Sequence, residues 1–185
     1  MKPDETETLR RQGGISLVEQ IMLLAIASLL GCMALPPLHD MLIRQRIRSA
    51  QLDFTVGLRY ARALAASENV RIVFCPTRDG RRCSNESQWD EGWLLGRDNN
   101  HDNQPDHEPL YVGRSRAGQV IVRSSEGRRH VLFHPNGNAP GSNITLLFCS
   151  RGSKDKALSI VIANSGRIRN APASAAQTAS CMAGT

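Results

Sequence analysis

The chain has 185 residues, of which 41% are hydrophobic and 4% aromatic, and it carries a formal net charge of +6 at pH 7. This length fits one ordinary domain with an appendage rather than several domains. The scarcity of aromatic residues predicts a mostly aliphatic core with few large anchors. The positive charge points to an acidic partner such as nucleic acid, anionic lipid or an acidic protein face.

The charges are segregated along the chain. Residues 79–108 contain eight acidic residues and three arginines, whereas ten basic and two acidic residues follow from residue 113 onward. One part of the domain should therefore be acidic and another strongly basic.

The N-terminal region contains a long apolar run, residues 15–35, whose one charged residue is Glu19. A run of about 20 residues can span a bilayer as a helix, and it exceeds the apolar segment of a cleaved secretory signal. A charged side chain there costs about 2.5–3.5 kcal/mol on insertion scales, so Glu19 needs a partner. Cleavage after Gly14 would supply one, because the new α-amine of Ile15 is a cation beside the membrane.

The helix is predicted to continue through residues 36–69 as an amphipathic second half and to end near Ser67-Glu68-Asn69, because apolar residues recur at spacings of three and four. The stripe comprises Ile47, Ala50, Phe54, Leu58, Ala61 and Ala65, with Arg44, Arg46, Arg48, Arg59 and Arg62 mostly off it.

Short strand patterns separated by turn sequences follow the helix. The candidate strands are 70–75, 93–95, 119–123, 130–133, 144–149 and 158–163. The predicted fold class is α+β, with a long N-terminal helix packed on an antiparallel sheet or small sandwich over residues 70–170. Residues 97–109 should form a polar loop, and the tail, 171–185, should be mobile from about Ala171.

Four of the five cysteines lie in the part that an N-terminal anchor would export to an oxidising compartment. Cys32 falls within the apolar run and is expected to pack there. Cys75, Cys83, Cys149 and Cys181 allow three pairings of two disulfides. We favour Cys75 with Cys83, which would close a short turn, and Cys149 with Cys181, which would tie the tail to a strand.

The sequence indicates no enzyme, cofactor or metal site. It lacks HExxH, paired CxxC, GxSxG and phosphate-binding glycine motifs. Asp98 to Asp102 begins like a calcium loop, but Asn103 replaces the required glycine and Pro109 stands at the last ligand position. His130 and His134 lack partners at fixed offsets and are expected to be ordinary sheet or turn residues.

The sequence SGRIRN places two arginines after the last candidate strand. Asn164-Ser165-Gly166 predicts a turn in which glycine takes a positive φ, and Arg167 and Arg169 would start the return strand. Strand alternation would set them on one face about 6.6 Å apart, a spacing close to that of successive phosphates, with Ile168 buried behind. Arginine also suits forked contact with phosphate oxygens. The basic residues Arg151, Lys154 and Lys156, in a turn one strand earlier, would widen this patch.

The N-terminal residues resemble the leader and cleavage site of type IV prepilins and type II secretion pseudopilins. The resemblance rests on Arg10 to Glu19, with a glycine before the cut and a glutamate at the fifth mature position, and on Pro36, where the family places a helix-bending proline. It implies that residues 1–14 form a leader, that a prepilin peptidase cuts after Gly14 and methylates Ile15, and that Glu19 serves assembly with other pilin subunits.

The C-terminal half resembles the GspH/FimT group of minor pilins. The sequence Gly166-Arg167-Ile168-Arg169 is similar to the GRxR element of FimT-type minor pilins, and softer motifs precede it in the family's order, including residues 89–93, 133–137 and 147–149. The resemblance implies a minor type IV pilin, held in the bacterial inner membrane with a periplasmic globular domain and then assembled into the pilus. It further implies sequence-independent DNA binding for uptake in natural transformation.

A second reading of the same residues belongs to a different class. A structural minor pilin, or a type II secretion pseudopilin of the GspH kind, would prime filament assembly without binding DNA. Its basic face would then meet acidic neighbouring subunits.

Overall fold

The computed structural model describes residues 16–125, 127–150 and 153–183, without the side chains of residues 31–37, 153–156 and 182–183. The chain divides into two compact units, Met1–His39 and Asp40–Thr185. The helix α1 (Leu17–Glu68) contributes to both units.

In the first unit, α1 begins with a capped turn. The Glu19 backbone N–H donates to the Ser16 hydroxyl at 3.3 Å, and the Glu19 carboxylate lies in the first turn, where it complements the helix dipole. The described apolar side chains of this unit are exposed, from Leu17 to Leu30. Among the residues whose side chains the structure describes, no helix combines the length and apolarity needed to cross a membrane.

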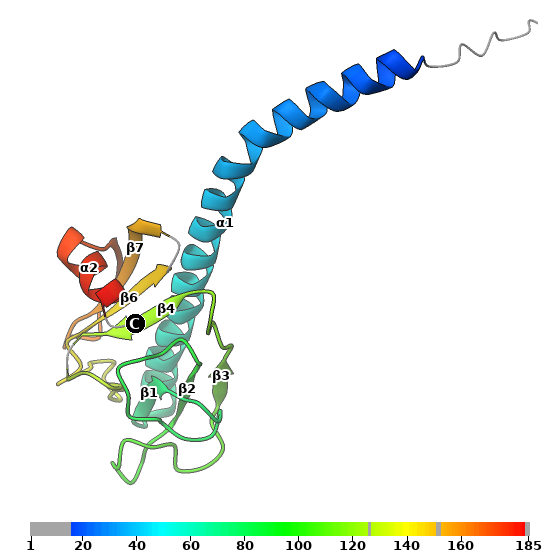
Figure 1. The fold of residues 1–185 in the computed structure, drawn as a ribbon. Coiled ribbons are helices and arrows are strands. Elements are labelled where there is room, and N and C mark those ends of the chain that lie inside the picture. The colour runs from blue at the N-terminus through cyan, green and yellow to red at the C-terminus, as the bar shows by residue number, and fades with distance from the viewer. Residues whose placement is uncertain (1–15, 126, 151–152, 184–185) are drawn as a thin grey trace, which may run out of the picture. The chain divides into compact units, whose positions relative to one another are not determined.

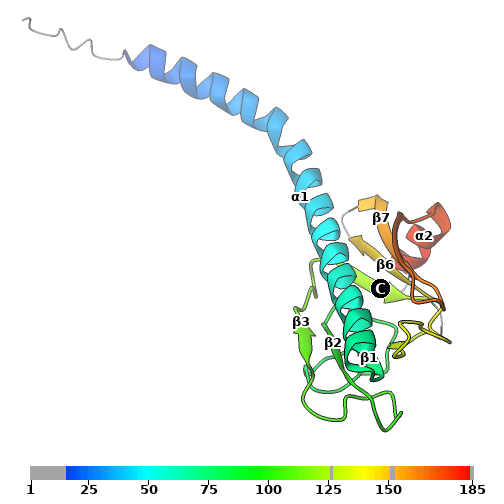
Figure 2. The same cartoon turned by 180° about the vertical axis from the view of Figure 1, so that it is seen from behind.

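The second unit contains two antiparallel four-stranded sheets. The first has the order β3-β2-β1-β5 and the second the order β4-β6-β7-β8. The strands are β1 (Ile72–Pro76), β2 (Trp93–Arg97), β3 (Tyr111–Gly113), β4 (Ile121–Ser124), β5 (Val131–Phe133), β6 (Ile144–Ser150), β7 (Ser153–Ile162) and β8 (Ile168–Pro172). The part of α1 after Asp40 passes across both sheets (Figures 1 and 2).

The apolar stripe of α1 forms the centre of the core, as predicted. Its residues are buried and belong to the same hydrophobic cluster as residues from both sheets. Helix and sheets therefore share one core, which confirms the predicted α+β class. The helix ends at Glu68, and Asn69 follows with φ 55, the left-handed conformation that commonly closes a helix.

The core is more aromatic than the composition suggested. All four phenylalanines and both tryptophans are buried, and Phe54 of α1 lies at the middle of four of these rings. Its centroid is 5.2 Å from that of Phe148, 5.7 Å from Trp93, 6.2 Å from Phe74 and 6.3 Å from Trp89. Each ring buries a large apolar area, so a few aromatic residues placed together provide much of the packing.

Both predicted disulfides are present. Cys75 bonds Cys83 across the turn after β1, and Cys149 of β6 bonds Cys181 near the C-terminus. The expectation of a mobile tail was wrong, because the helix α2 (Ala175–Ala183) forms there and packs on β6 and β7 (Figure 1). Cys181 is buried in a second small core on this face of the sheet.

A reciprocal cap explains how a helix of small residues begins in this tail. The Gln177 backbone N–H donates to the Ser174 hydroxyl at 3.2 Å, and the Ser174 N–H donates to the Gln177 side-chain oxygen at 2.9 Å. This arrangement is a capping box. The cap and the disulfide together order a segment that composition alone marks as loose.

Candidate nucleic-acid interface

The two arginines of the SGRIRN sequence flank the start of β8 in the last hairpin. The Gly166 N–H donates to the Ala163 carbonyl at 2.8 Å, and the Ala163 N–H donates to the Arg167 carbonyl at 3.0 Å. Gly166 has a φ of 73, as the turn requires. Arg167 immediately precedes β8, and Arg169 is its second residue.

Both arginines are exposed, and Ile168 between them is partly buried against the core. Alternation predicted one shared face for the pair, but the strand starts only at Ile168. The next residue after Arg169, Asn170, accepts a hydrogen bond from Thr55 of α1 at 3.0 Å, so alternation directs Arg169 away from the helix. Arg167 instead lines a groove beside α1.

This groove, called here the arginine groove, lies between the end of α1 and the β7–β8 turn and has a volume of about 470 Å³. Its lining residues are Arg59, Arg62, Ala63, Ala66, Asn136, Gly137, Arg167 and Ile168. Three arginines from two elements therefore meet at one concavity.

The arginine groove is fixed by close packing of backbone. Arg62 Nε donates to the Gly137 carbonyl at 3.0 Å, and the Ala139 N–H donates to the Asn164 carbonyl at 2.8 Å. A Cβ added at Gly166 would overlap the Gly137 carbonyl oxygen and would lie 3.2 Å from Arg62 Nε. Glycine at position 166 thus lets the turn rest directly on the loop that Arg62 holds.

The arginines of this region make no ion pair with a carboxylate in the part of the chain that the structure describes. The ion pairs found there join Arg71 to Asp98, Arg78 to Glu86 and Glu91, Arg97 to Glu68, and Arg116 to Asp53. Arg59, Arg62, Arg167 and Arg169 are in none of these pairs.

Two of the other three basic residues predicted for the patch, Lys154 and Lys156, lie away from the β7–β8 turn. Arg151 is outside the described residues. The strand β7 begins at Ser153, five residues earlier than predicted, so Lys154 and Lys156 are strand positions at its far end. Lys156 is five residues from Val161, the partner of Arg169, which corresponds to about 17 Å along a strand. The longer strand therefore separates these lysines from the β7–β8 turn.

The arginines of α1 were not predicted as site residues. Arg59 and Arg62 are exposed and three residues apart, so they lie on one face of the helix. That spacing was visible in the sequence, but nothing in it showed that this face borders the last hairpin. Of the N-terminal residues predicted for processing, Gly14 and Ile15 lie outside the described residues.

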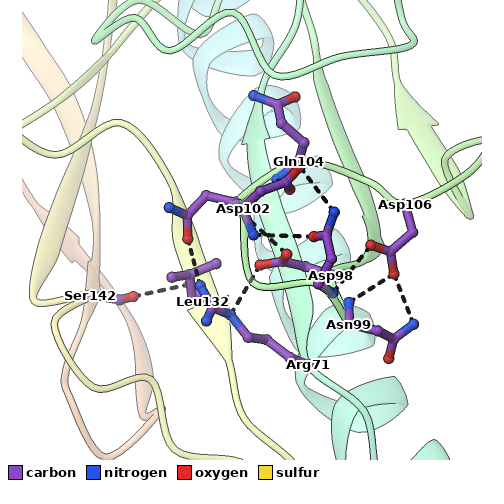
Figure 3. A network of polar contacts seen from close by, with 10 residues as sticks. Arg71, Asp98, Asn99, Asp102, Gln104, Asp106, Leu132 and Ser142 are labelled. Carbon is purple, nitrogen blue, oxygen red and sulfur yellow. Dashed lines mark hydrogen bonds and ion pairs between the residues drawn. The ribbon is translucent and has the colours of Figure 1, made fainter.

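Three of the four carboxylates of the acidic loop, residues 97–109, bond partners within the domain. The Asp98 side chain is fully buried and pairs with Arg71 Nε at 3.0 Å. Asp106 accepts hydrogen bonds from the Asn99 backbone N–H at 2.7 Å and the Asn99 side chain at 2.8 Å (Figure 3). The described residues contain no group of three or more His, Cys, Asp and Glu side chains suited to hold a metal ion.

These features define a class of protein. A long N-terminal helix whose second half is buried against two antiparallel sheets, with the C-terminal segment joined by a disulfide, is a pilin-like α+β architecture. The family model of the type II transport protein GspH matches residues 50–166, and the chain belongs to this family.

Solved structures share this fold. Two crystal forms of the type IV minor pilin FimU from Pseudomonas aeruginosa strain PAO1 align with the chain. One has 24% identity and a TM-score of 0.58, covering 70% of this chain and 90% of FimU. The other has 23% identity and a TM-score of 0.55, covering 68% and 92% respectively. The comparison with curated proteins gives no match.

Proposed function

We propose that this chain is a FimT-like minor type IV pilin that binds DNA without sequence preference and supports DNA uptake in natural transformation, as well as pilus assembly. The GspH family and the pilin-like fold support the role as a filament subunit. The observation that carries DNA binding is the placement of Arg167 and Arg169 at the braced β7–β8 turn and the start of β8, where both are exposed and make no ion pair with any described carboxylate.

The N-terminal sequence supports a proposed order of processing, membrane insertion and assembly. A prepilin peptidase cuts after Gly14 and methylates Ile15, and residues 15–35 hold the subunit in the inner membrane as a single span before assembly. Glu19 then pairs with the N-terminal amine of its own or a neighbouring subunit within the filament. The globular domain is periplasmic, which agrees with the presence of two disulfides.

The proposed mechanism is electrostatic capture of the phosphate backbone. Arginine makes forked, charge-assisted hydrogen bonds to phosphate oxygens, and such contacts carry no sequence information. If about four cationic side chains neutralise phosphates, log K should fall with log salt concentration at a slope of about −3.6.

The direct test is DNA binding by the full chain in neutral detergent, measured by fluorescence anisotropy with a labelled random-sequence duplex. The R167Q/R169Q variant should lose most of its affinity while keeping the wild-type melting temperature. A matched control is R81Q/R82Q, which removes the same charge from another exposed turn and should bind nearly as well as the wild type. Unchanged affinity of R167Q/R169Q would contradict DNA binding by this hairpin.

The second candidate is a structural pseudopilin that primes a type II secretion filament and binds no DNA. The match to the type II transport protein GspH favours it. Deletion of the gene separates the two candidates: loss of transformation with intact protein secretion supports the first, and loss of secretion with intact transformation supports the second.

A further inference from the structure

We propose that the arginine groove holds a phosphate group of the bound DNA strand, so that the DNA path runs from the β7–β8 turn onto the end of α1. This inference rests on the proposed function and adds Arg59 and Arg62 to its binding surface. The DNA would then contact both α1 and the β7–β8 turn, which are about 100 residues apart in sequence.

Like charges converge at the arginine groove. Arg59 and Arg62 reach the groove from one face of α1, and Arg167 reaches it from the hairpin. Three guanidinium groups around one concavity repel each other unless an anion lies among them, and a cleft lined by one sign of charge concentrates counter-ions of the other sign. None of the ion pairs formed by described carboxylates includes Arg59, Arg62 or Arg167, so the groove is suited to an anion supplied by a ligand.

One of the three arginines, Arg62, is already held in place. One N–H of Arg62 donates to the Gly137 carbonyl. Arg62 also lies against Gly137 and Gly166, because a Cβ added at either glycine would come within 3.3 and 3.2 Å of its Nε respectively. A guanidinium carries five N–H donors, so most of them remain for a ligand. Because its position is fixed before binding, little side-chain freedom is lost when the anion arrives.

The shape and chemistry of the groove suit a phosphate ligand. Its walls include Ala63 and Ala66, whose side chains are single methyl groups, and Gly137, which has none, so space is left for a ligand; Asn136 adds a neutral polar group. A volume of about 470 Å³ is within the range of small-molecule sites. The groove is therefore large enough for a phosphate with part of its sugar. An extended nucleic-acid strand whose backbone faces the protein would place these groups there.

The experiment compares variants of the full chain in neutral detergent, by anisotropy with the same duplex at several salt concentrations. R59Q should weaken binding about 5- to 10-fold, as expected for one charge-assisted contact, and should make the salt slope shallower by about 0.9, the value for one lost phosphate contact. The matched control is R46Q, an exposed arginine of the same helix that does not line the groove. It should change the affinity less than twofold and leave the slope unchanged.

A second pair of variants tests the groove without removing an arginine. A63E places a carboxylate among the three guanidinium groups, where it would occupy the anion site, and should weaken binding at least about 10-fold. S49E adds the same charge to an exposed position of α1 away from the groove and should have a small effect. Melting temperatures establish whether each variant is folded. If A63E does not fold, R59Q alone tests the groove.

The results separate this inference from the proposed function. If R167Q/R169Q loses DNA binding but R59Q and A63E behave like their controls, the groove is not part of the DNA path and the proposed function stands. If the wild-type chain binds no DNA, both are overturned. If R59Q and A63E lose binding and R46Q and S49E do not, the groove is established as a phosphate site.

Discussion

The acidic loop of residues 97–109 and the arginine groove are both rich in charge, but they use that charge differently. In the loop, Asp98 is buried against Arg71, and hydrogen bonds from the Asn99 backbone N–H lower the pKa of Asp106 below its ordinary value. In the groove, Arg62 bonds a backbone carbonyl, and no described carboxylate pairs with the groove arginines.

Two segments of a sequence can be equally rich in charge and still differ in function, depending on whether the fold supplies partners for those charges. Charges that are matched inside the fold hold a loop in shape and leave little for a partner. Charges that converge without a counter-charge raise the local potential and favour a ligand of opposite sign. The loop is therefore structural, and the groove is the candidate binding surface.

The largest effect should come from breaking the ion pair that anchors the loop. Arg71→Met leaves the fully buried Asp98 carboxylate without its guanidinium, and removal of one partner of a buried pair costs about 3–5 kcal/mol. Urea unfolding should show a loss of this size in the free energy of unfolding. Under conditions in which R71M is folded, its DNA affinity should equal that of the wild type, because the loop takes no part in binding.

A second substitution checks the cause of that loss. Asp98→Asn removes the buried charge, so R71M/D98N should be more stable than R71M alone. If the two variants are equally unstable, the loss comes from packing of the Arg71 side chain rather than from an unpaired carboxylate. Weakened DNA binding by folded R71M would mean that the two regions are not separate in function.

An intermediate effect is expected at the glycine that seats the hairpin. Gly166→Ala forces a side chain into a left-handed conformation, at about 1–2 kcal/mol, and its Cβ would also overlap the Gly137 carbonyl. We expect a total loss of about 2–3 kcal/mol in unfolding free energy. DNA affinity should fall as well, because the turn carrying Arg167 must move away from α1.

A matched control separates these two costs. Gly141 has a φ of 72, almost that of Gly166, but an added Cβ there meets nothing within 4 Å. Gly141→Ala should therefore show the conformational cost alone and leave DNA affinity unchanged. Equal losses of stability and affinity in both variants would show that the Gly137 contact is not important for either property.

Much of the second unit could be predicted because its signals are local. The α1 stripe repeats every three to four residues, the cysteines were few enough to pair, and Asn164-Ser165-Gly166 marked the last turn. The edge strand β3 was missed because two of its three residues are exposed, whereas β5, equally short, was found because all three of its residues are large and apolar. The bond that ties the tail to Cys149 was predicted, but the order of the tail was missed because the Ser174 cap that begins α2 lies in a run of small residues.

The arginine groove could be predicted only in part. Arg167 was found because a glycine turn and a neighbouring arginine mark it locally. Arg59 was not, because its place beside Arg167 depends on how α1 packs on the second sheet, and no short sequence pattern encodes that contact. The lysines of β7 were placed too close to the site because the strand extends five residues beyond its clearest apolar alternation, through residues whose charges looked like those of a turn.

The smallest expected effect is a pH dependence at the border of the acidic loop. His130 is half-buried, and burial is the largest cause of its lowered pKa. The charge of Arg71 acts in the same direction, Asp98 opposes it, and Arg128 adds to the lowering. The unfolded state therefore binds a proton at a higher pH than the folded state does. The stabilisation is complete above the unfolded value of about 6.5 and is lost as the pH falls through it toward the folded pKa.

Chemical denaturation between pH 7.5 and pH 5 measures this contribution. The free energy of unfolding of the wild type should decrease over this range more steeply than that of H130Q, which has no imidazole to protonate. H107Q, which replaces an exposed histidine of the acidic loop, should retain the wild-type slope. The carboxylates with lowered pKa values, Glu68, Asp79 and Asp106, are present in both proteins and therefore do not contribute to the difference between their slopes. Parallel slopes for the wild type and H130Q would show that His130 is not held neutral by its surroundings.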